Sequence, residues 1–181
     1  MKRAANIAMA AFASAAIALP AAVNVPKLLL WNASASAPIG LYLVQSASVL
    51  RAADLVVVAP PPELVAFLSL RGYLPDGVPL LKRVFALQGQ TVCRDGLEIR
   101  AFGVAVGRAQ IRDRAGRPLP IWQGCRVIAE GELFLMNPDV PDSVDSRYFG
   151  PLPRSSVVGR ALPIFTDAAG DGRFVWRAAT P

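Results

Sequence analysis

Lys82 is the residue of this chain whose surroundings most favour chemistry. It lies in the apolar run 79–85, whereas the other two lysines, Lys2 and Lys27, flank an N-terminal apolar stretch. Burial against apolar neighbours lowers the pKa of a lysine, so that its neutral amine can accept a proton. A serine hydroxyl needs such a base before it can act as a nucleophile. The chain has no histidine, which excludes a Ser-His-Asp triad and a Cys-His dyad.

The composition is that of a folded protein. Hydrophobic residues make up 54% of the 181 residues and charged residues 18%, a balance too apolar for a disordered chain. Two cysteines without histidine cannot form a zinc site alone, so we expect no metal and no cofactor. The net charge is +6, but the arginines are scattered and not interleaved with aromatic residues. We therefore expect no nucleic-acid partner and assign the charge to solvated surface or to attraction by anionic lipid.

Residues 1–27 are predicted to form a membrane anchor. Lys2 and Arg3 precede the uncharged stretch 4–26, which Lys27 ends. As a helix this stretch would be about 34 Å long, enough for a bilayer core of roughly 30 Å.

The orientation of this anchor follows from its charges. Lys2 and Arg3 favour a cytoplasmic N-terminus, which places residues 28–181 on the outer side of the membrane. Two alternatives remain open. Residues 16–18 read Ala-Ile-Ala, which suits a cleavable signal peptide, and the stretch could also be a buried core helix.

Residues 28–181 are predicted to form one mainly β domain, because short apolar runs alternate with proline and glycine. The predicted strands are residues 40–44, 55–59, 80–87, 91–93, 97–100, 125–129, 132–136 and 157–165. One short amphipathic helix is predicted at residues 63–70, an exposed loop or hairpin at 101–120, and a short polar tail from Thr166.

Three motifs occur in a defined order along the chain. Residues 36–42 read S-x-P-x-G-L-Y, residues 71–74 read R-G-Y-L, and residues 145–151 read D-S-R-Y-F-G-P. With these motifs the sequence resembles the signal peptidase I family of Ser/Lys-dyad membrane proteases. It resembles most the conjugative-transfer signal peptidases of the TraF type. The resemblance covers residues 27–165 and implies a β protease domain behind one membrane helix.

The resemblance implies a role for each of four polar residues. Ser36 matches the nucleophile and Lys82 its general base. Ser34 matches a serine whose hydroxyl joins the backbone N–H of Ser36 in an oxyanion hole, although a serine here also suits a simple turn. Ser143 matches a serine that hydrogen-bonds the lysine amine and orients it.

Other residues of the motifs match supporting positions. Asp145 and Arg147 match an ion pair beneath the site, with Arg83 nearby, and this group would support the structure rather than react. The chain also departs from the general enzymes, which carry methionine after the nucleophile and G-D-N before the D-S-R motif. Here those places hold Ala37 and residues 137–139, Asn-Pro-Asp, which favours the TraF branch.

Cys93 and Cys125 are predicted to form a disulfide. Their number is even, both lie in predicted strands, and the domain is expected in an oxidising compartment. Their Cα atoms should then lie about 4.4–6.8 Å apart. Two free buried thiols are the alternative.

The predicted function is that of a membrane-anchored serine endopeptidase. It would cleave the signal segment of an exported precursor, and the TraF resemblance implies a conjugative pilin precursor. Its partners would be that precursor and, through the N-terminal helix, membrane lipid. A general type I signal peptidase and a non-enzymatic membrane-anchored assembly protein are the alternatives. Whether the product is hydrolysed or cyclised stays open.

Overall fold

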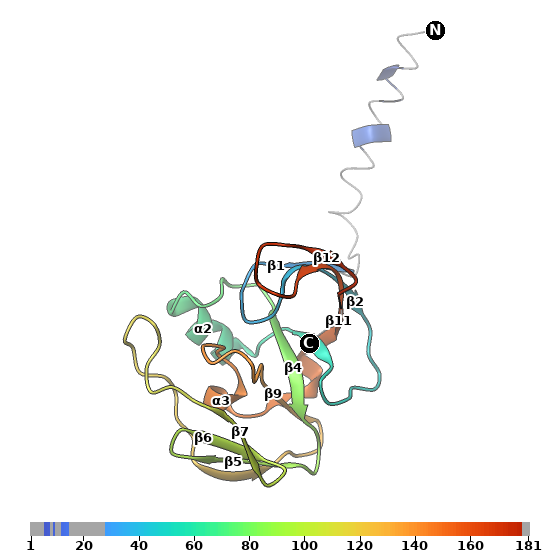
Figure 1. The fold of residues 1–181 in the computed structure, drawn as a ribbon. Helices are drawn as coiled ribbons and strands as arrows, with labels where there is room; N and C mark the ends of the chain where they lie inside the picture. The colour runs from blue at the N-terminus through green and yellow to red at the C-terminus, as the bar shows by residue number, and fades with distance from the viewer. Residues whose placement is uncertain (1–5, 8, 10–11, 15–27, 179–181) are drawn as a thin grey trace.

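The protein is mainly β (Figure 1). The computed structural model describes residues 6–7, 9, 12–14 and 28–178. Its strands are β1 (Leu29–Asn32), β2 (Ile39–Gln45), β3 (Leu55–Val58), β4 (Leu80–Ala86), β5 (Thr91–Asp95), β6 (Glu98–Ala101), β7 (Val104–Arg108), β8 (Gly124–Val127), β9 (Glu132–Leu135), β10 (Leu152–Pro153), β11 (Val157–Asp167) and β12 (Val175–Trp176). Its helical segments are α2 (Pro62–Leu70), α3 (Ser146–Phe149) and the 3-10 turn η1 (Arg154–Ser156).

The larger sheet has the strand order β1-β2-β11-β3-β4-β9-β10, with β12 paired to β11. All four residues of β3 are buried because hydrophobic clusters cover both faces of the sheet. Val56 and Val58 pack into one cluster, and Leu55 and Val57 pack into another. The neighbouring strand β4 pairs with β3 on one side and with β9 on the other. Lys82 therefore lies on an interior strand.

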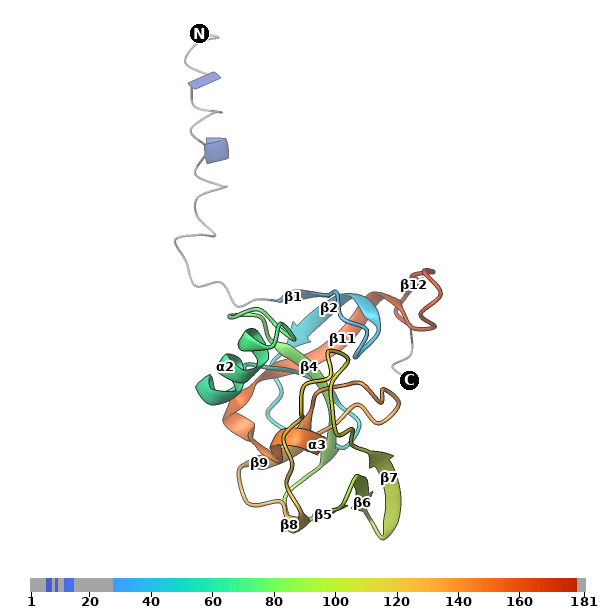
Figure 2. The same cartoon turned by 90° about the vertical axis from the view of Figure 1, so that its left-hand side faces the viewer.

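Helix α2 covers one face of this sheet (Figure 2). Leu64 and Leu68, one helical turn apart, pack into the cluster that contains Val58. The helix begins with Pro62, where a missing backbone N–H costs no hydrogen bond. The chain reverses after it at Gly72, whose φ is +66°. The predicted helix is thus confirmed.

The smaller sheet has the order β7-β6-β5-β8. It lies at the opposite end of the molecule from β1 and β12 in both Figure 1 and Figure 2. Its apolar face packs in a cluster with Trp122 and Phe134. The segment 101–120, expected as a loop or a hairpin, contains both: β7 forms a hairpin with β6, and a loop follows it.

The other predicted strands are confirmed to within a few residues, but very short elements escaped prediction. Strands β1, β10 and β12 and helix α3 have between two and four residues each, too few to show a period. The prediction of a short polar tail from Thr166 is wrong in part, because the segment contains strand residues. Strand β11 continues to Asp167, and β12 returns to pair with it.

The predicted membrane anchor, residues 1–27, lies almost wholly outside the described residues. Residues 6–7, 9 and 12–14 are helical. In the part of the chain that the structure describes, no helix has the length and apolar character needed to cross a membrane. The anchor stays a prediction.

Candidate active site

The side chain of Lys82 is buried in the interior of the protein, with 3% of its surface exposed. Its Nζ donates a hydrogen bond to Ser143 Oγ at 2.7 Å. None of the ion pairs among the described residues includes Lys82. Burial lowers the pKa of Lys82 to about 8; the negative charge of Asp145 opposes this and the positive charge of Arg147 adds to it. The amine therefore loses its proton far more readily than an exposed lysine does.

Ser36 lies in the loop between β1 and β2, and Asn32 fixes the shape of that loop. The Asn32 amide nitrogen donates to the carbonyl oxygens of Ser34, Ala37 and Pro38 at 2.9–3.0 Å. Its amide oxygen accepts from the backbone N–H of Ser34 at 3.1 Å and from the Ser34 hydroxyl at 3.0 Å. These five bonds close the loop around the buried Asn32 and leave Ser36 half-buried at its surface.

Gly40 allows the strand after this loop to approach β11. Its φ is +143°, and a Cβ added there would lie 2.2 Å from the carbonyl oxygen of Phe165. Only glycine fits such a conformation and such a contact. The glycine of the first motif therefore has a structural reason.

The hydroxyl of Ser36 contacts that of Ser34, with 3.0 Å between the two Oγ atoms. Among residues 28–178 there is no hydrogen bond from Lys82 to Ser36; the lysine bonds to Ser143 instead. The expected contact between the amine of Lys82 and the hydroxyl of Ser36 is therefore still a prediction. The expected neighbours of each group, Ser143 and Ser34, are in place.

Asn137 joins the Ser36 loop to the strand of Lys82. Its amide nitrogen donates to the carbonyl oxygen of Ser36 and, at 3.3 Å, to that of Leu81. Its amide oxygen accepts from the backbone N–H of Arg83 at 3.0 Å. The side chain thus contacts both residues that flank Lys82. Ser36 and Lys82 are 46 positions apart in sequence, and this one amide bonds to the backbone of Ser36 and to the residues on each side of Lys82.

Asp145 and Arg147 form a buried ion pair, as the motif resemblance implies. Arg147 Nε lies 2.8 Å from Asp145 Oδ1, and their side chains are 1% and 0% exposed. Asp145 also accepts from the backbone N–H of Arg147 at 3.2 Å, which caps α3. Arg147 donates to the carbonyl oxygens of Val140 and Ser143 at 2.7 and 3.1 Å. The pair therefore fixes the loop that carries Ser143.

Arg83 lies outside this ion pair. Its guanidinium donates to the carbonyl oxygen of Ala53 at 3.3 Å, and its side chain lines a pocket beside Asp139. Consecutive residues of a strand point to opposite faces, so Arg83 points away from Lys82 and from the ion pair.

A pocket of about 470 Å³ opens beside Ser36. Much of its wall is formed by small or apolar side chains: Ala35, Ala37, Ile39, Val140, Ala168 and Ala169. Asp167 shapes the far wall, because its carboxylate accepts from the backbone N–H groups of Gly170 and Gly172 at 2.8 and 2.9 Å. Such a pocket can hold small side chains next to the Ser36 hydroxyl.

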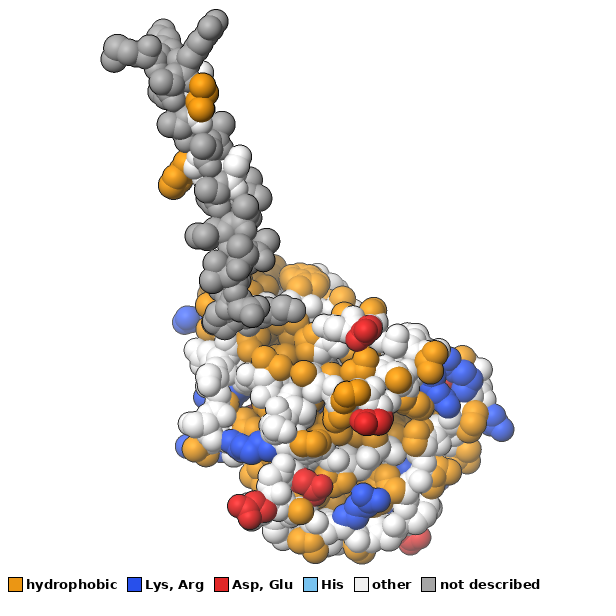
Figure 3. All heavy atoms as spheres, turned by 180° about the vertical axis from the view of Figure 1, so that it is seen from behind, with side chains coloured by type: hydrophobic (Ala, Val, Ile, Leu, Met, Phe, Trp, Pro, Cys, Tyr) orange, Lys and Arg blue, Asp and Glu red, His pale blue; other side chains and the backbone are white. Residues whose placement is uncertain are grey.

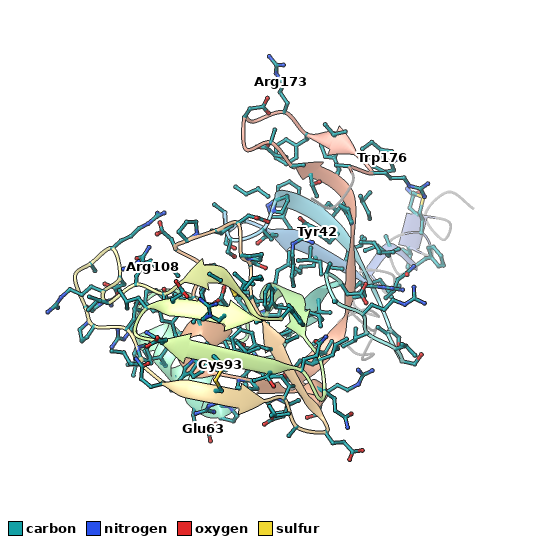
Figure 4. The ribbon with its side chains drawn as sticks, turned by 60° about the horizontal axis from the view of Figure 1, so that its bottom comes forward. Tyr42, Glu63, Cys93, Arg108, Arg173 and Trp176 are labelled. Atoms are coloured by element: carbon teal, nitrogen blue, oxygen red, sulfur yellow. A yellow bond between two sulfur atoms is a disulfide. The ribbon has the colours of Figure 1, made fainter. Side chains whose placement is uncertain are left out.

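Cys93 and Cys125 form a disulfide between β5 and β8 (Figure 4). The predicted pairing is confirmed. Their Cα atoms are 3.9 Å apart, which is below the expected range, and the two cysteines lie directly opposite each other on paired strands. In the part of the chain that the structure describes, no group of acidic, cysteine or histidine side chains could hold a metal ion.

Three residues with a structural part in the site escaped sequence analysis. Asn32 and Asn137 are described above, and the third is Arg94, which is 1% exposed. Arg94 Nη1 donates to the carbonyl oxygen of Arg147 at 2.6 Å, so it connects the smaller sheet to α3, the helix that follows the loop of Ser143. Asparagine and arginine are ordinary surface residues by type, and each of these acts through a partner that cannot be read from its neighbours in sequence.

The chain is similar in sequence to several known proteins. The family model for signal peptidase, peptidase S26, matches residues 1–166. Conjugal transfer protein TraF of Agrobacterium fabrum is 38% identical over 146 residues, covering 75% of this chain and 81% of that protein. Plasmid transfer protein TraF of Escherichia coli is 33% identical, with the same coverage. The probable signal peptidase I-1 of Synechocystis is 33% identical over 118 residues, covering 65% of this chain and 56% of that protein.

A solved signal peptidase I structure from Enterococcus faecalis aligns with a TM-score of 0.37 and 21% identity, covering 64% of this chain and 98% of that chain. The family assignment rests on the family model and on the sequence relatives. The model matches far more than half of the chain, and the chain covers about four-fifths of the TraF proteins at 33–38% identity. The chain therefore belongs to the signal peptidase family, peptidase S26.

Proposed function

We propose that this chain is a membrane-anchored serine endopeptidase in which Ser36 is the nucleophile and Lys82 its general base. The observation that carries the proposal is the state of the Lys82 amine: it is buried, it bonds to a neutral hydroxyl, and its pKa is about 8. At pH 7 about one such amine in eleven is neutral, against roughly one in 3,000 at a pKa of 10.5.

In the proposed reaction, Lys82 accepts the proton of Ser36 while Oγ attacks the carbonyl carbon of the scissile peptide. The neutral amine keeps two N–H donors and one lone pair. Donation to Ser143 uses one N–H and restrains the rotation of the amine, so that the lone pair can be turned toward Ser36. The protonated amine then gives its proton to the leaving nitrogen, which leaves an acyl-enzyme on Ser36.

The oxyanion of the tetrahedral intermediate would be bound by the backbone N–H of Ser36 and the hydroxyl of Ser34. In the free enzyme the Ser34 hydroxyl bonds to Asn32 and to Ser36. It has one proton, so binding the oxyanion requires that it turn away from Asn32. A donor of this kind contributes about 3–4 kcal/mol to transition-state stabilisation in serine proteases.

The proposed substrate is an exported precursor protein that binds in an extended conformation. The pocket beside Ser36 has small apolar walls, which suits small side chains near the cleavage point. The precursor would add as a strand beside the Ser36 loop. Since the relatives that cover most of this chain are conjugal and plasmid transfer proteins, we take a conjugative pilin precursor as the first candidate. Water or a peptide amine could resolve the acyl-enzyme.

We also propose that the domain lies at the outer surface of the cytoplasmic membrane. Aromatic side chains support this: the exposed Trp31 on β1 and Phe165 on β11 both stack with the half-buried Phe174, at 5.9 and 5.3 Å. Trp176 on β12 is also exposed. Strands β1 and β12 lie together at one end of the molecule, and hydrophobic side chains occur there as well as over the rest of the face in Figure 3.

Cleavage of a defined precursor tests the catalytic assignment. The full chain in detergent is incubated with a pilin precursor and, separately, with a general exported precursor that has an Ala-x-Ala site, and the products are identified by mass. We expect wild type to cleave, Ser36→Ala and Lys82→Arg to be inactive although folded, and Ser69→Ala, which removes an exposed hydroxyl on α2, to be fully active.

The outcomes separate the alternatives. Cleavage of the pilin precursor alone supports the specialised enzyme, whereas cleavage of both favours a general signal peptidase. Near-wild-type cleavage by Lys82→Arg would refute the dyad, because a guanidinium cannot act as a base near neutral pH. Absence of cleavage by wild type with both precursors would favour a non-enzymatic assembly protein.

A further inference from the structure

We infer that Asn137 is a positioning residue that sets the separation between the nucleophile and its base. The inference rests on the proposed function of Ser36 and Lys82. The Asn137 side chain is the described group that bonds both to the backbone of Ser36 and to the backbone on each side of Lys82.

The side chain of Asn137 takes the place of a missing strand residue beside β4. Strand β9 ends at Leu135, and the next backbone N–H, that of Met136, still donates to the carbonyl oxygen of Arg83 at 3.0 Å. Beyond that point the edge of β4 presents the N–H of Arg83 and the carbonyl oxygen of Leu81. The Asn137 amide supplies one acceptor and one donor to these groups at 3.0 and 3.3 Å, as a peptide group would.

The second N–H of the Asn137 amide links strand β4 to the backbone of the nucleophile, Ser36. A carboxamide nitrogen has two hydrogens. One is donated to the carbonyl oxygen of Leu81 and the other to the carbonyl oxygen of Ser36. The carbonyl oxygen of Ser36 is therefore held one hydrogen bond away from the Asn137 amide. That amide is itself bonded to the backbone on each side of Lys82. A residue without a second donor could satisfy β4 but could not hold the Ser36 loop.

The backbone of Asn137 is fixed by the buried ion pair. Its N–H donates to Asp145 Oδ2 at 3.1 Å, and its carbonyl oxygen accepts from Arg147 Nη2 at 3.4 Å. The residue is 4% exposed. The pair Asp145–Arg147, which makes no hydrogen bond to Ser36, thus acts on the nucleophile through Asn137.

A purely structural role for Asn137 makes a different prediction from a positioning role. If the amide only satisfies the edge of β4, substitutions lower stability and leave the kinetics of the folded enzyme unchanged. If it positions Ser36, the folded variant binds its precursor normally and turns it over slowly. Misplacement of a reacting group by about 1 Å can cost on the order of 100-fold in rate.

Two substitutions separate these roles. Asn137→Asp keeps the size of the side chain and the acceptor for the N–H of Arg83 but loses both donors. Asn137→Ala loses the whole bridge. The matched control is Gln123→Ala, because the Gln123 amide likewise bonds one backbone N–H and one carbonyl oxygen, those of Gly96, in the smaller sheet.

The experiment measures kcat, KM and their pH dependence for the full chain, with the precursor that wild type cleaves as the substrate. Thermal unfolding of each variant is measured as well. We expect kcat to fall about 10- to 100-fold in Asn137→Ala and Asn137→Asp with KM within about threefold of wild type. In Asn137→Asp the added carboxylate should also raise the pH at which activity is half-maximal, because it stabilises the protonated form of Lys82. Gln123→Ala should show neither change.

Either of two results would overturn the inference. One is a folded Asn137→Asp or Asn137→Ala enzyme whose kcat is within twofold of wild type; should the alanine variant fail to fold, the aspartate variant decides. The other is a loss confined to KM. Ser36→Ala is assayed in parallel. If Ser36→Ala still cleaves the precursor at the wild-type rate, the proposed function itself is refuted. If cleavage requires Ser36 but is unchanged by substitution of Asn137, only this inference is refuted.

Discussion

Replacing Lys82 by methionine should stabilise the protein near neutral pH and lose that advantage at alkaline pH. The charged amine is buried without a carboxylate partner, so the folded protein bears the cost of removing it from water. Methionine has a similar length and no charge. The one polar loss is the hydrogen bond to Ser143, which costs about 1–3 kcal/mol at every pH.

The size of the effect follows from the pKa of Lys82, which is lowered from 10.5 to about 8. Below pH 8 the lysine is protonated in both the folded and the unfolded chain, and folding bears the full penalty of roughly 3 kcal/mol. Between pH 8 and 10.5 the folded protein releases the proton while the unfolded chain still binds it. Wild-type stability therefore rises with pH in this window. The difference between Lys82→Met and wild type should shrink by roughly 2–3 kcal/mol from pH 7 to pH 10.

Urea unfolding of the full chain in detergent, followed by tryptophan fluorescence at pH 7 and at pH 10, measures this difference. Comparing the two proteins at each pH cancels the titration of every other group. Leu80→Met is the control, since Leu80 is a buried, uncharged neighbour on the same strand, and its difference from wild type should not depend on pH. A Lys82→Met difference that is the same at both pH values would refute the lowered pKa, and with it the argument for Lys82 as base.

Two further predictions concern topology and the buried ion pair. Protease added to spheroplasts should digest the body of the protein, because Lys2 and Arg3 favour a cytoplasmic N-terminus; complete protection would mean the opposite orientation. Arg147→Met should lower the free energy of unfolding in urea by about 3–5 kcal/mol, because it leaves the carboxylate of Asp145 buried and unpaired. Arg100→Met, which breaks an exposed ion pair, should cost less than about 1 kcal/mol, and equal losses would contradict the reasoning.

Sequence predicted the elements whose residues carry a pattern of their own. The apolar runs at β3 and β4 are long enough to be recognised as strands, and the burial of Lys82 follows from its place in the second run. The neighbourhood of Ser143 and Lys82 came from the ordered motifs and is present in the structure. Cys93 and Cys125 were paired by number and by expected compartment, and they face each other across one ladder.

The hydrogen bonds that hold the site together could not be predicted from the sequence. Asn137 and Ser36 are 101 positions apart, and Arg94 and Arg147 are 53 positions apart. Nothing around an asparagine indicates which distant carbonyl its amide will meet, because side-chain hydrogen bonds depend on how whole strands are placed. Strand β12 escaped prediction for the same reason, since its two residues pair only because β11 is already in position.

The buried ion pair gives the site its electrostatic character as well as its shape. The negative charge of Asp145 raises the pKa of Lys82, whereas the positive charge of Arg147 lowers it. Asp145 directs both carboxylate oxygens to Arg147 at 2.8 and 2.9 Å, and it makes no bond to the lysine. An unpaired carboxylate at this place would stabilise the protonated amine and weaken the base. Removing Arg147 should therefore shift the activity profile to higher pH in addition to destabilising the fold. Burial is the largest cause of the lowered pKa of Lys82, and Arg147 adds to it by opposing the charge of Asp145.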